Sequence, residues 1–214
     1  GLALGAAAAA AIGWVAVGLT PAYSENRQQL FAIEHFFDQD EGTARWLVNN
    51  DGAALPRGFE DFEERFEPPW SRRKRWSAPA PTLPIEAPSA QLIGAGAEGE
   101  GRRLRLRLAA NGAETVTLKL PAEARPLAAG FPGFVRPFGK GGDEDPYWLR
   151  CQGRSCDGAV IDLVIAETAP VEIGFIGLHR GLPEEAEPLV AARPAHARPQ
   201  YVIDGRYAVR RVRF

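Results

Sequence analysis

The first twenty residues of the chain contain no charged side chain, and the sequence turns polar directly after them. Residues 1–20 are rich in Ala and Gly, with scattered Leu, Ile and Val. A helix of this length measures about 30 Å, the thickness of the hydrocarbon core of a bilayer. The pattern predicts a transmembrane helix at 1–20, and its small residues are typical of helices that pack within a larger bundle.

A signal-peptide core and a buried Ala-rich helix are the two alternatives. No basic residue precedes Arg27, and residues 20–23 make a poor cleavage site, so the signal peptide is disfavoured. The chain begins with Gly1 and contains no Met. We therefore expect a processed product or a piece of a longer protein, with 1–20 as the last helix of its bundle.

Residues 21–76 predict a β-hairpin followed by a short amphipathic helix. The apolar stretch 29–38 and the strand-like stretch 44–48 flank a turn-rich sequence at 39–42. Two apolar runs separated by Gly and carboxylates are typical of a hairpin. A helix that runs through Glu34 is the alternative.

The amphipathic helix is predicted from a phenylalanine pattern. Phe59, Phe62 and Phe66 stand at positions i, i+3 and i+7, which places them on one face of a helix. Pro68 and Pro69 would end that helix, because proline lacks the donor that the next turn needs.

The rest of the chain is predicted to be a Pro-rich strap at 77–90 and an antiparallel β-sandwich at 91–214. Short apolar runs recur at intervals of roughly ten residues between Gly- and Pro-rich turns, which is typical of sandwiches. Besides a hairpin near its start, the sandwich is expected to contain strands at 147–151, 159–165, 171–176 and 206–214. The expected fold is therefore mainly β, preceded by one N-terminal transmembrane helix.

The hairpin near the start of the sandwich is predicted from strict alternation. Residues 102–108 alternate Arg and Leu, so Leu104, Leu106 and Leu108 would share a dry face. An Asn-Gly turn leads to 115–120, which alternates in the same sense, so the two strands are expected to pair. The arginine row then faces water.

The net charge and the cysteine content bear on the partners and the cellular compartment of the domain. The net charge is −2, so no global field indicates nucleic acid as a partner. Cys151 and Cys156 are the only cysteines. Outside the cytoplasm they would form a disulfide; two free thiols or half of a metal site are the alternatives.

Several motifs resemble functional sites but fail their context tests. Gly94, Gly96 and Gly99 match a dinucleotide-binding pattern, but a strand rather than a helix follows, so we expect a flexible turn. The carboxylates at 38–42 lack the spacing of a calcium loop and are expected to form a hairpin turn.

Neither a catalytic residue nor a metal ligand is predicted in this chain. His35, His179 and His196 are far apart and lack partners at ligand spacing. Ser155 does not lie in a nucleophile-elbow motif. No cofactor is expected for these residues.

One dense basic run has two interpretations. It comprises Trp70, Arg72, Arg73, Lys74, Arg75 and Trp76. The run is a candidate membrane-surface patch, because cations near an anionic bilayer are each stabilised by about 1 kcal/mol. The alternative is a loop whose tryptophans pack on the sandwich and stack with arginine.

The order of motifs along the whole chain resembles the C-terminal region of one family of membrane-bound bacterial peptidases. The motifs are Pro21-Ala-Tyr-Ser24-x-x-Arg27-x-Gln29, Asp38-x-Asp40-x-Gly42-x-Ala44-x-Trp46, Trp76-Ser-Ala-Pro79, the Cys151–Gly158 segment, Gly181-Leu-Pro183 and Ala191-Ala-Arg-Pro194. The family is the twenty-eighth metallopeptidase family, relatives of the endoplasmic-reticulum metallopeptidase. Gln28 departs from the family pattern, in which Pro is expected.

The resemblance implies a role that is defined by a larger parent chain. Members of the family combine a two-zinc exopeptidase domain, membrane helices and a terminal β-domain. The zinc ligands and the general base belong to the upstream domain, so none is carried over to this sequence. The expected partners are the bilayer, through 1–20, and the upstream domain and helices, with 21–214 on the periplasmic side.

The sequence therefore supports two functional hypotheses. The first is a non-catalytic accessory domain of a membrane-anchored zinc exopeptidase. The alternative is an extracytoplasmic binding module that holds a glycan or an envelope partner. Exposed Trp46, Trp76 and Trp148 on one face would favour the glycan module, whereas buried tryptophans would favour the accessory domain.

Overall fold

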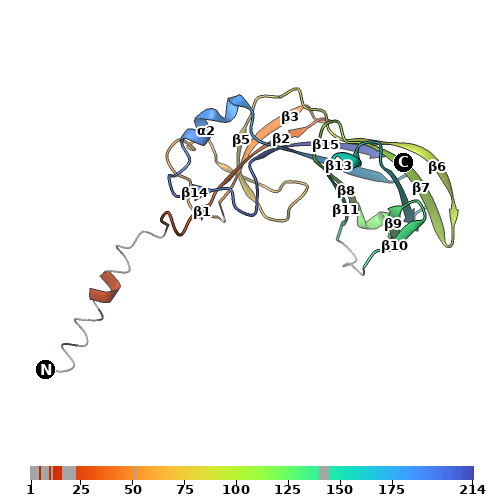
Figure 1. Ribbon diagram of the computed structural model, residues 1–214, viewed down its shortest axis with the longest axis horizontal. Helices are drawn as coiled ribbons and strands as arrows, with labels where there is room; N and C mark the ends of the chain where they lie inside the picture. The colour runs from red at the N-terminus through yellow and green to blue at the C-terminus, as the bar shows by residue number, and fades with distance from the viewer. Residues whose placement is uncertain (1–4, 6–9, 11, 16–22, 51, 140–144) are drawn as a thin grey trace.

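The computed structural model describes residues 5, 10, 12–15, 23–50, 52–139 and 145–214 (Figure 1). Most of the predicted transmembrane helix lies outside the described residues; 5, 10 and 12–15 are helical. No helix within these described ranges is long and apolar enough to cross a membrane. Ile12, Trp14 and Val15 are exposed. The transmembrane helix at 1–20 thus stays a prediction.

The fold is mainly β, as predicted, and its largest element is an eight-stranded sheet. In spatial order its strands are β11 (Tyr147–Gln152), β8 (Thr115–Leu120), β13 (Glu172–Arg180), β15 (Gly205–Arg213), β2 (Ala32–Asp38), β3 (Thr43–Asn49), β5 (Arg75–Pro79) and β4 (Glu64–Phe66). All neighbours are antiparallel except β15 and β2, which run parallel. That parallel pair joins strands from the two ends of the described domain.

A five-stranded antiparallel sheet packs against one end of the large sheet (Figure 1). Its strands are β10 (Phe134–Pro137), β9 (Pro126–Phe131), β12 (Val160–Ile165), β7 (Gly101–Ala109) and β6 (Ser89–Glu98). Leu104, Leu106, Leu118, Leu163 and Phe175 are fully buried in one core cluster to which both sheets contribute. The two sheets therefore enclose the main hydrophobic core.

Short elements cover the opposite end of the large sheet. They are β1 (Gln29–Leu30), β14 (Ala197–Arg198), the 3₁₀ turn η3 (Glu184–Ala186) and α2 (Glu187–Ala191). A second core cluster there contains Phe31, Ile33, Trp46 and Val48. The remaining 3₁₀ turns, η1 (Ala122–Ala124) and η2 (Arg154–Cys156), lie in connections of the sandwich.

The predicted pairing of 102–108 with 115–120 is wrong. Strand β7 pairs with β6 and β12, whereas β8 pairs with β11 and β13, so the two strands belong to different sheets. Asn111 and Gly112 both have positive φ and form a corner between the sheets. Alternation predicts which face of each strand is buried. It does not predict which strands pair, because two strands that face each other across a core show the same alternation as two strands paired in a hairpin.

The predicted amphipathic helix at 59–66 is also wrong. Phe59 and Phe62 lie in a turn and are buried under the second core cluster, whereas Phe66 ends β4 and packs on the other face of the sheet. Three aromatic side chains in so short a segment satisfy helical spacing by chance. Local spacing could not reveal that two separate cores draw on the segment.

The predicted domain boundaries do not separate independent units. A strap was expected at 77–90. Strand β5 extends to Pro79 and β6 begins at Ser89, so the connection between these two strands comprises only 80–88. Strands from 21–76 and from 91–214 share the eight-stranded sheet. The parallel contact of β15 with β2 makes one continuous sheet from segments about 170 residues apart, and such long-range pairing leaves no local sequence signal.

Candidate functional site

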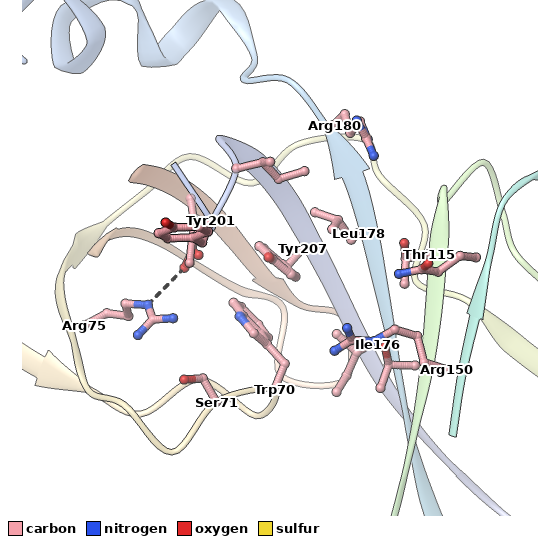
Figure 2. Close-up of a pocket in the computed structure, with 15 residues that line it drawn as sticks. Trp70, Ser71, Arg75, Thr115, Arg150, Ile176, Leu178, Arg180, Tyr201 and Tyr207 are labelled. Atoms are coloured by element: carbon pink, nitrogen blue, oxygen red, sulfur yellow. Dashed lines mark hydrogen bonds and ion pairs between the residues drawn. The ribbon is translucent and has the colours of Figure 1, made fainter. Parts of the chain in front are cut away.

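A groove of about 370 Å³ lies on the face of the eight-stranded sheet that turns away from the main core (Figure 2). Ile176, Leu178 and Tyr207 of β13 and β15 contribute to its lining. They point to this face because their strand neighbours, such as Phe175, point into the sandwich core. The loop before β5 and the strand β11 supply Trp70 and Arg150 from either side.

Aromatic rings in the groove are packed against one another. The indole of Trp70 stacks on Tyr207, with ring centroids 3.9 Å apart and an interplanar angle of 7°. Phe36 lies 5.5 Å from the same indole, and Phe66 lies 5.2 Å from Phe36. One ring face of Trp70 and one of Tyr207 are therefore covered by protein.

A buried ion pair lies beside these rings. Arg75 Nε donates to Glu34 Oε2 at 3.4 Å, and the two side chains are 5% and 0% exposed. Burial raises the pKa of the Glu34 carboxyl from 4.5 to about 7, although Arg75 opposes the shift. Burial also raises the pKa of Tyr207, and the carboxylate of Glu34 adds to that effect. Glu34 thus titrates near neutral pH.

Two polar atoms at the groove are left without partners. Glu34 Oε1 and Trp70 Nε1 are buried and have no hydrogen-bond partner among the described residues. A buried polar atom without a partner costs about 1–3 kcal/mol. A further polar group that formed hydrogen bonds with these two atoms would therefore stabilise the fold.

Guanidinium groups dominate the other end of the groove. Arg180 Nε donates to Glu114 Oε2 at 2.8 Å. Arg150 is exposed and has no ion-pair partner within the described part of the chain. A second hollow of about 790 Å³ shares Thr115, Gln152 and Arg180 with the groove. The two hollows are therefore adjacent to one another at the ends of β8, β11 and β13.

The predicted basic patch at 70–76 is divided between two faces of the sheet. Trp70 and Arg75 lie at the groove, as described above. Trp76 points to the opposite face, where it packs on the second core cluster and its Nε1 donates to the Ala53 carbonyl at 3.3 Å. The Arg65 guanidinium lies 3.8 Å from the Trp76 ring centroid. Alternation along β5 separates Arg75 from Trp76, and Trp70 lies in the loop on the Arg75 side, so the two tryptophans do not form one membrane-facing surface.

The remaining cations of the run are exposed. Arg72 pairs with Asp145 across the surface. Arg73 accepts a hydrogen bond at its carbonyl oxygen from Arg75 Nη1, at 3.0 Å. Lys74 is exposed. Trp70, Trp76 and Arg75 thus pack against the protein, as the alternative interpretation of the run expects. Within the run, only 72–74 present charged side chains to solvent.

Cys151 and Cys156 form a disulfide with a Cα–Cα distance of 5.7 Å. The bond joins β11 to η2, and Cys156 is buried in the main core. The disulfide therefore holds the turn η2, which contains Arg154, against the sandwich.

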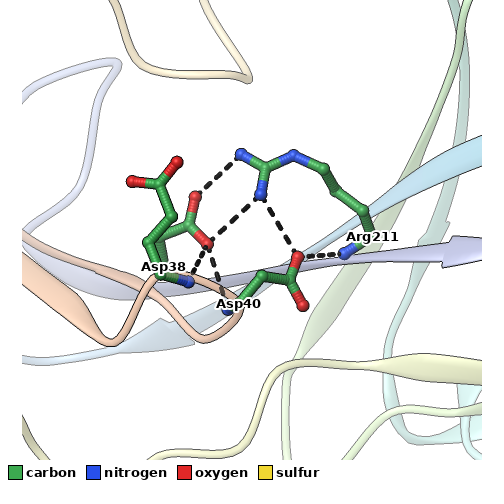
Figure 3. A network of polar contacts seen from close by, with 4 residues as sticks. Asp38, Asp40 and Arg211 are labelled. Carbon is green, nitrogen blue, oxygen red and sulfur yellow. Dashed lines mark hydrogen bonds and ion pairs between the residues drawn. The ribbon is translucent and has the colours of Figure 1, made fainter.

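The carboxylates at 38–42 form a turn that is held by Arg211 (Figure 3). Arg211 Nη2 donates to Asp38 Oδ2 at 2.8 Å, and the Arg211 backbone N–H donates to Asp40 Oδ2 at 2.6 Å. Asp38 Oδ1 also accepts from the backbone N–H of Asp40 at 3.1 Å. Gly42, with φ of 65°, completes the hairpin between β2 and β3. The cluster ties the hairpin to β15.

No group of His, Cys, Asp and Glu with a metal-binding arrangement occurs among the described residues. His35 is buried, its Nε2 lies 2.9 Å from the Pro81 carbonyl oxygen, and burial lowers its pKa. Gly94 and Gly96 lie inside strand β6 rather than in the flexible turn that was expected; only Gly99 has positive φ. The resemblance assigns the two zinc ions to the upstream domain, and that assignment stays a prediction.

The arginine row of β7 lies on the outer face of the five-stranded sheet. Arg105 donates to both carboxylate oxygens of Asp162, at 2.7 and 2.9 Å. Arg103 pairs with Glu98 at 2.6 Å. These are cross-strand pairs on a solvated face, and they belong to the sheet rather than to the groove.

The tryptophan arrangement that would favour a glycan module is not observed. Trp46 is 7% exposed in the second core cluster, and Trp76 is half-buried beside it. Trp148 is 39% exposed and lies on another strand, with the Lys119 ammonium 5.5 Å from its ring centroid. The three tryptophans therefore do not form a platform.

Comparison with protein-family models, curated proteins and solved structures finds no match to this chain. The sequence motifs alone carry the resemblance to membrane-bound peptidases. Sequence reasoning missed Glu34 and Tyr207 as parts of a site. Glu34 did leave a signal, because it is a carboxylate inside the otherwise apolar run Leu30-Phe-Ala-Ile-Glu-His-Phe-Phe37. Tyr207 left none.

Proposed function

We propose that this chain is a non-catalytic accessory domain of a membrane-bound zinc exopeptidase of the twenty-eighth metallopeptidase family. In this proposal residues 1–20 cross the bilayer, 21–214 lie on the periplasmic side, and an upstream domain with two zinc ions hydrolyses the peptide. The order of sequence motifs is the basis for the family. The disulfide supports the periplasmic side, because such bonds persist in oxidising compartments.

The observation that carries the accessory role is the groove on the eight-stranded sheet. It combines an apolar floor with Thr, Gln and Arg side chains, a composition suited to holding a peptide or a partner surface. Its one fully buried carboxylate, Glu34, is paired with Arg75 and shielded from solvent. The groove therefore offers binding groups, while hydrolysis is assigned to the upstream domain.

The second candidate, a glycan-binding module, is less well supported. Sugar rings bind best on open aromatic faces. Here Trp70 is enclosed by Phe36 and Tyr207, and Trp46 is buried. Only Tyr201 lines the groove with a fully exposed ring.

The accessory role is tested by shortening the full-length parent protein. The full-length protein and a form that ends at residue 22 are compared in membranes for abundance, for zinc-dependent release of amino acids from peptides, and for preference among peptides. We expect the short form to reach the membrane but to show altered peptide preference or lower stability. Unchanged abundance, activity and preference would contradict the proposal, as would a parent protein whose peptide release survives zinc chelation.

A thiol-trapping experiment tests the compartment separately. Cells are quenched in acid, denatured, and treated with a maleimide polymer before or after reduction. We expect Cys151 and Cys156 of this chain to react only after reduction. Reaction without reduction would place the domain in a reducing compartment.

A further inference from the structure

The groove and the second hollow form one trough that suits an extended chain. They share Thr115, Gln152 and Arg180, so the two hollows adjoin at these three side chains. Together they run from the rings of Trp70 and Tyr207 to the loop that carries Arg154. A compact ligand would fill one hollow, whereas a short peptide would use both.

The side chains that the hollows share are suited to a peptide backbone. Thr115 offers a hydroxyl and Gln152 an amide, and each group both donates and accepts hydrogen bonds. A peptide backbone needs both kinds of partner at short intervals. Ile176 and Leu178 supply apolar surface for its side chains.

The charge of the trough favours an anionic group on that peptide. The carboxylates of Glu34 and Glu114 are paired with Arg75 and Arg180. Asp157 Oδ1 accepts from the Ala110 backbone N–H at 2.9 Å. Arg150 and Arg154 lack ion-pair partners among the residues that the structure describes, so two guanidinium groups remain available.

We propose that this trough binds the carboxylate-bearing end of an extended peptide, with Arg150 as the residue that receives the carboxylate. Arg150 of β11 lies in one cross-strand row with Thr117 and Ile176, and Gln152, Thr115 and Leu178 form the neighbouring row. A terminal carboxylate at Arg150 therefore leaves the preceding residues beside Ile176 and Leu178. A guanidinium binds a carboxylate through two parallel hydrogen bonds. The idea rests on the proposed function, because an exopeptidase acts on peptides with free ends.

The test measures binding by the full chain in detergent micelles. The probes are the peptide Ala-Phe-Ala-Leu-Ala with a free terminal carboxylate and the same peptide as an amide, titrated by calorimetry. We expect the acid to bind at least about tenfold more tightly than the amide, which is the lower end for a hydrogen bond to a charged group. Arg150→Gln should remove this preference, and Arg150→Lys should keep part of it.

The matched control is Arg107→Gln. Arg107 is an exposed arginine on a strand of the other sheet, so its loss should leave the preference unchanged. Equal binding of acid and amide, binding of neither, or a preference that survives Arg150→Gln would overturn the proposal. So would a chitin oligosaccharide that binds in the trough and displaces the peptide acid. Thermal unfolding of each variant shows that it is folded.

The two proposals fail in distinguishable ways. If the chain binds the peptide acid through Arg150 but the parent protein shows no zinc-dependent peptide release, the peptide site stands and the family role falls. If the parent protein releases amino acids and depends on this domain, but the chain does not distinguish acid from amide, the accessory role stands and the carboxylate site falls.

Discussion

The buried ion pair of Glu34 and Arg75 makes the stability of the folded protein depend on pH. The pKa of Glu34 is raised from 4.5 to about 7 because burial disfavours the ionised form more than Arg75 stabilises it. The folded protein therefore keeps a proton that the unfolded chain releases between these values. It follows that the Glu34 contribution to stability falls as the pH rises from 4.5 to about 7.

Removing the cation should be costly only where Glu34 is ionised. We expect Arg75→Met to lower the free energy of unfolding by about 3 kcal/mol at about pH 8, because it leaves a buried carboxylate unpaired. At about pH 5.5 Glu34 is mostly protonated, so the loss should be clearly smaller. Urea denaturation at both pH values measures the difference.

Arg72→Met is the control for this experiment. Arg72 lies in the loop directly before β5, but its pair with Asp145 is exposed, and such pairs contribute at most about 1 kcal/mol. A loss for Arg75→Met that does not change with pH would show that Glu34 is not the group responsible.

The hairpin of β6 and β7 shows the constraints that act on single elements. Its turn places Gly101 against the neighbouring strand β12, where an added Cβ would lie 2.1 Å from the Ile165 carbonyl oxygen. Gly96 in the same hairpin has no atom within 4 Å of that position. The glycines look alike in the sequence, yet only one of them is held by packing.

This difference predicts opposite outcomes for two similar substitutions. We expect Gly101→Ala to lower the free energy of unfolding by about 2 kcal/mol or more, because backbone must move to admit the methyl group. Gly96→Ala should change it by no more than about 0.5 kcal/mol. Chemical denaturation of the two variants checks this, and equal losses would show that Gly101 does not approach β12 as described.

At the scale of the whole molecule, the large sheet is assembled from both ends of the chain. Strand β15 lies between β13 and β2, and Tyr207 and Val209 are buried in a cluster with Phe36 and Leu47 from the early strands. This smaller cluster therefore needs both ends of the chain, whereas the buried residues of the main core cluster all lie within 104–175.

A chain that begins at residue 91 should therefore be less stable than the full chain. It lacks β2 and β3, so β15 becomes an edge strand with uncovered apolar side chains. We expect urea to unfold the shortened chain at a clearly lower concentration than the full chain, as followed by circular dichroism and tryptophan fluorescence. Equal midpoints for the two chains would show that the contact of β15 with β2 does not stabilise the sandwich.

By itself, the sequence determined the β-rich class, the strands at 147–151, 159–165, 171–176 and 206–214, and the buried face of each alternating strand. These features follow from local periodicity, which any strand on a core must obey. Only the tertiary structure decided which strands pair, because 102–108 and 115–120 alternate in the same way whether they are neighbours or face each other. It also decided the site, since Glu34, Arg75, Arg150 and Tyr207 lie far apart in the sequence and meet only where β15 joins the two ends of the chain in one sheet.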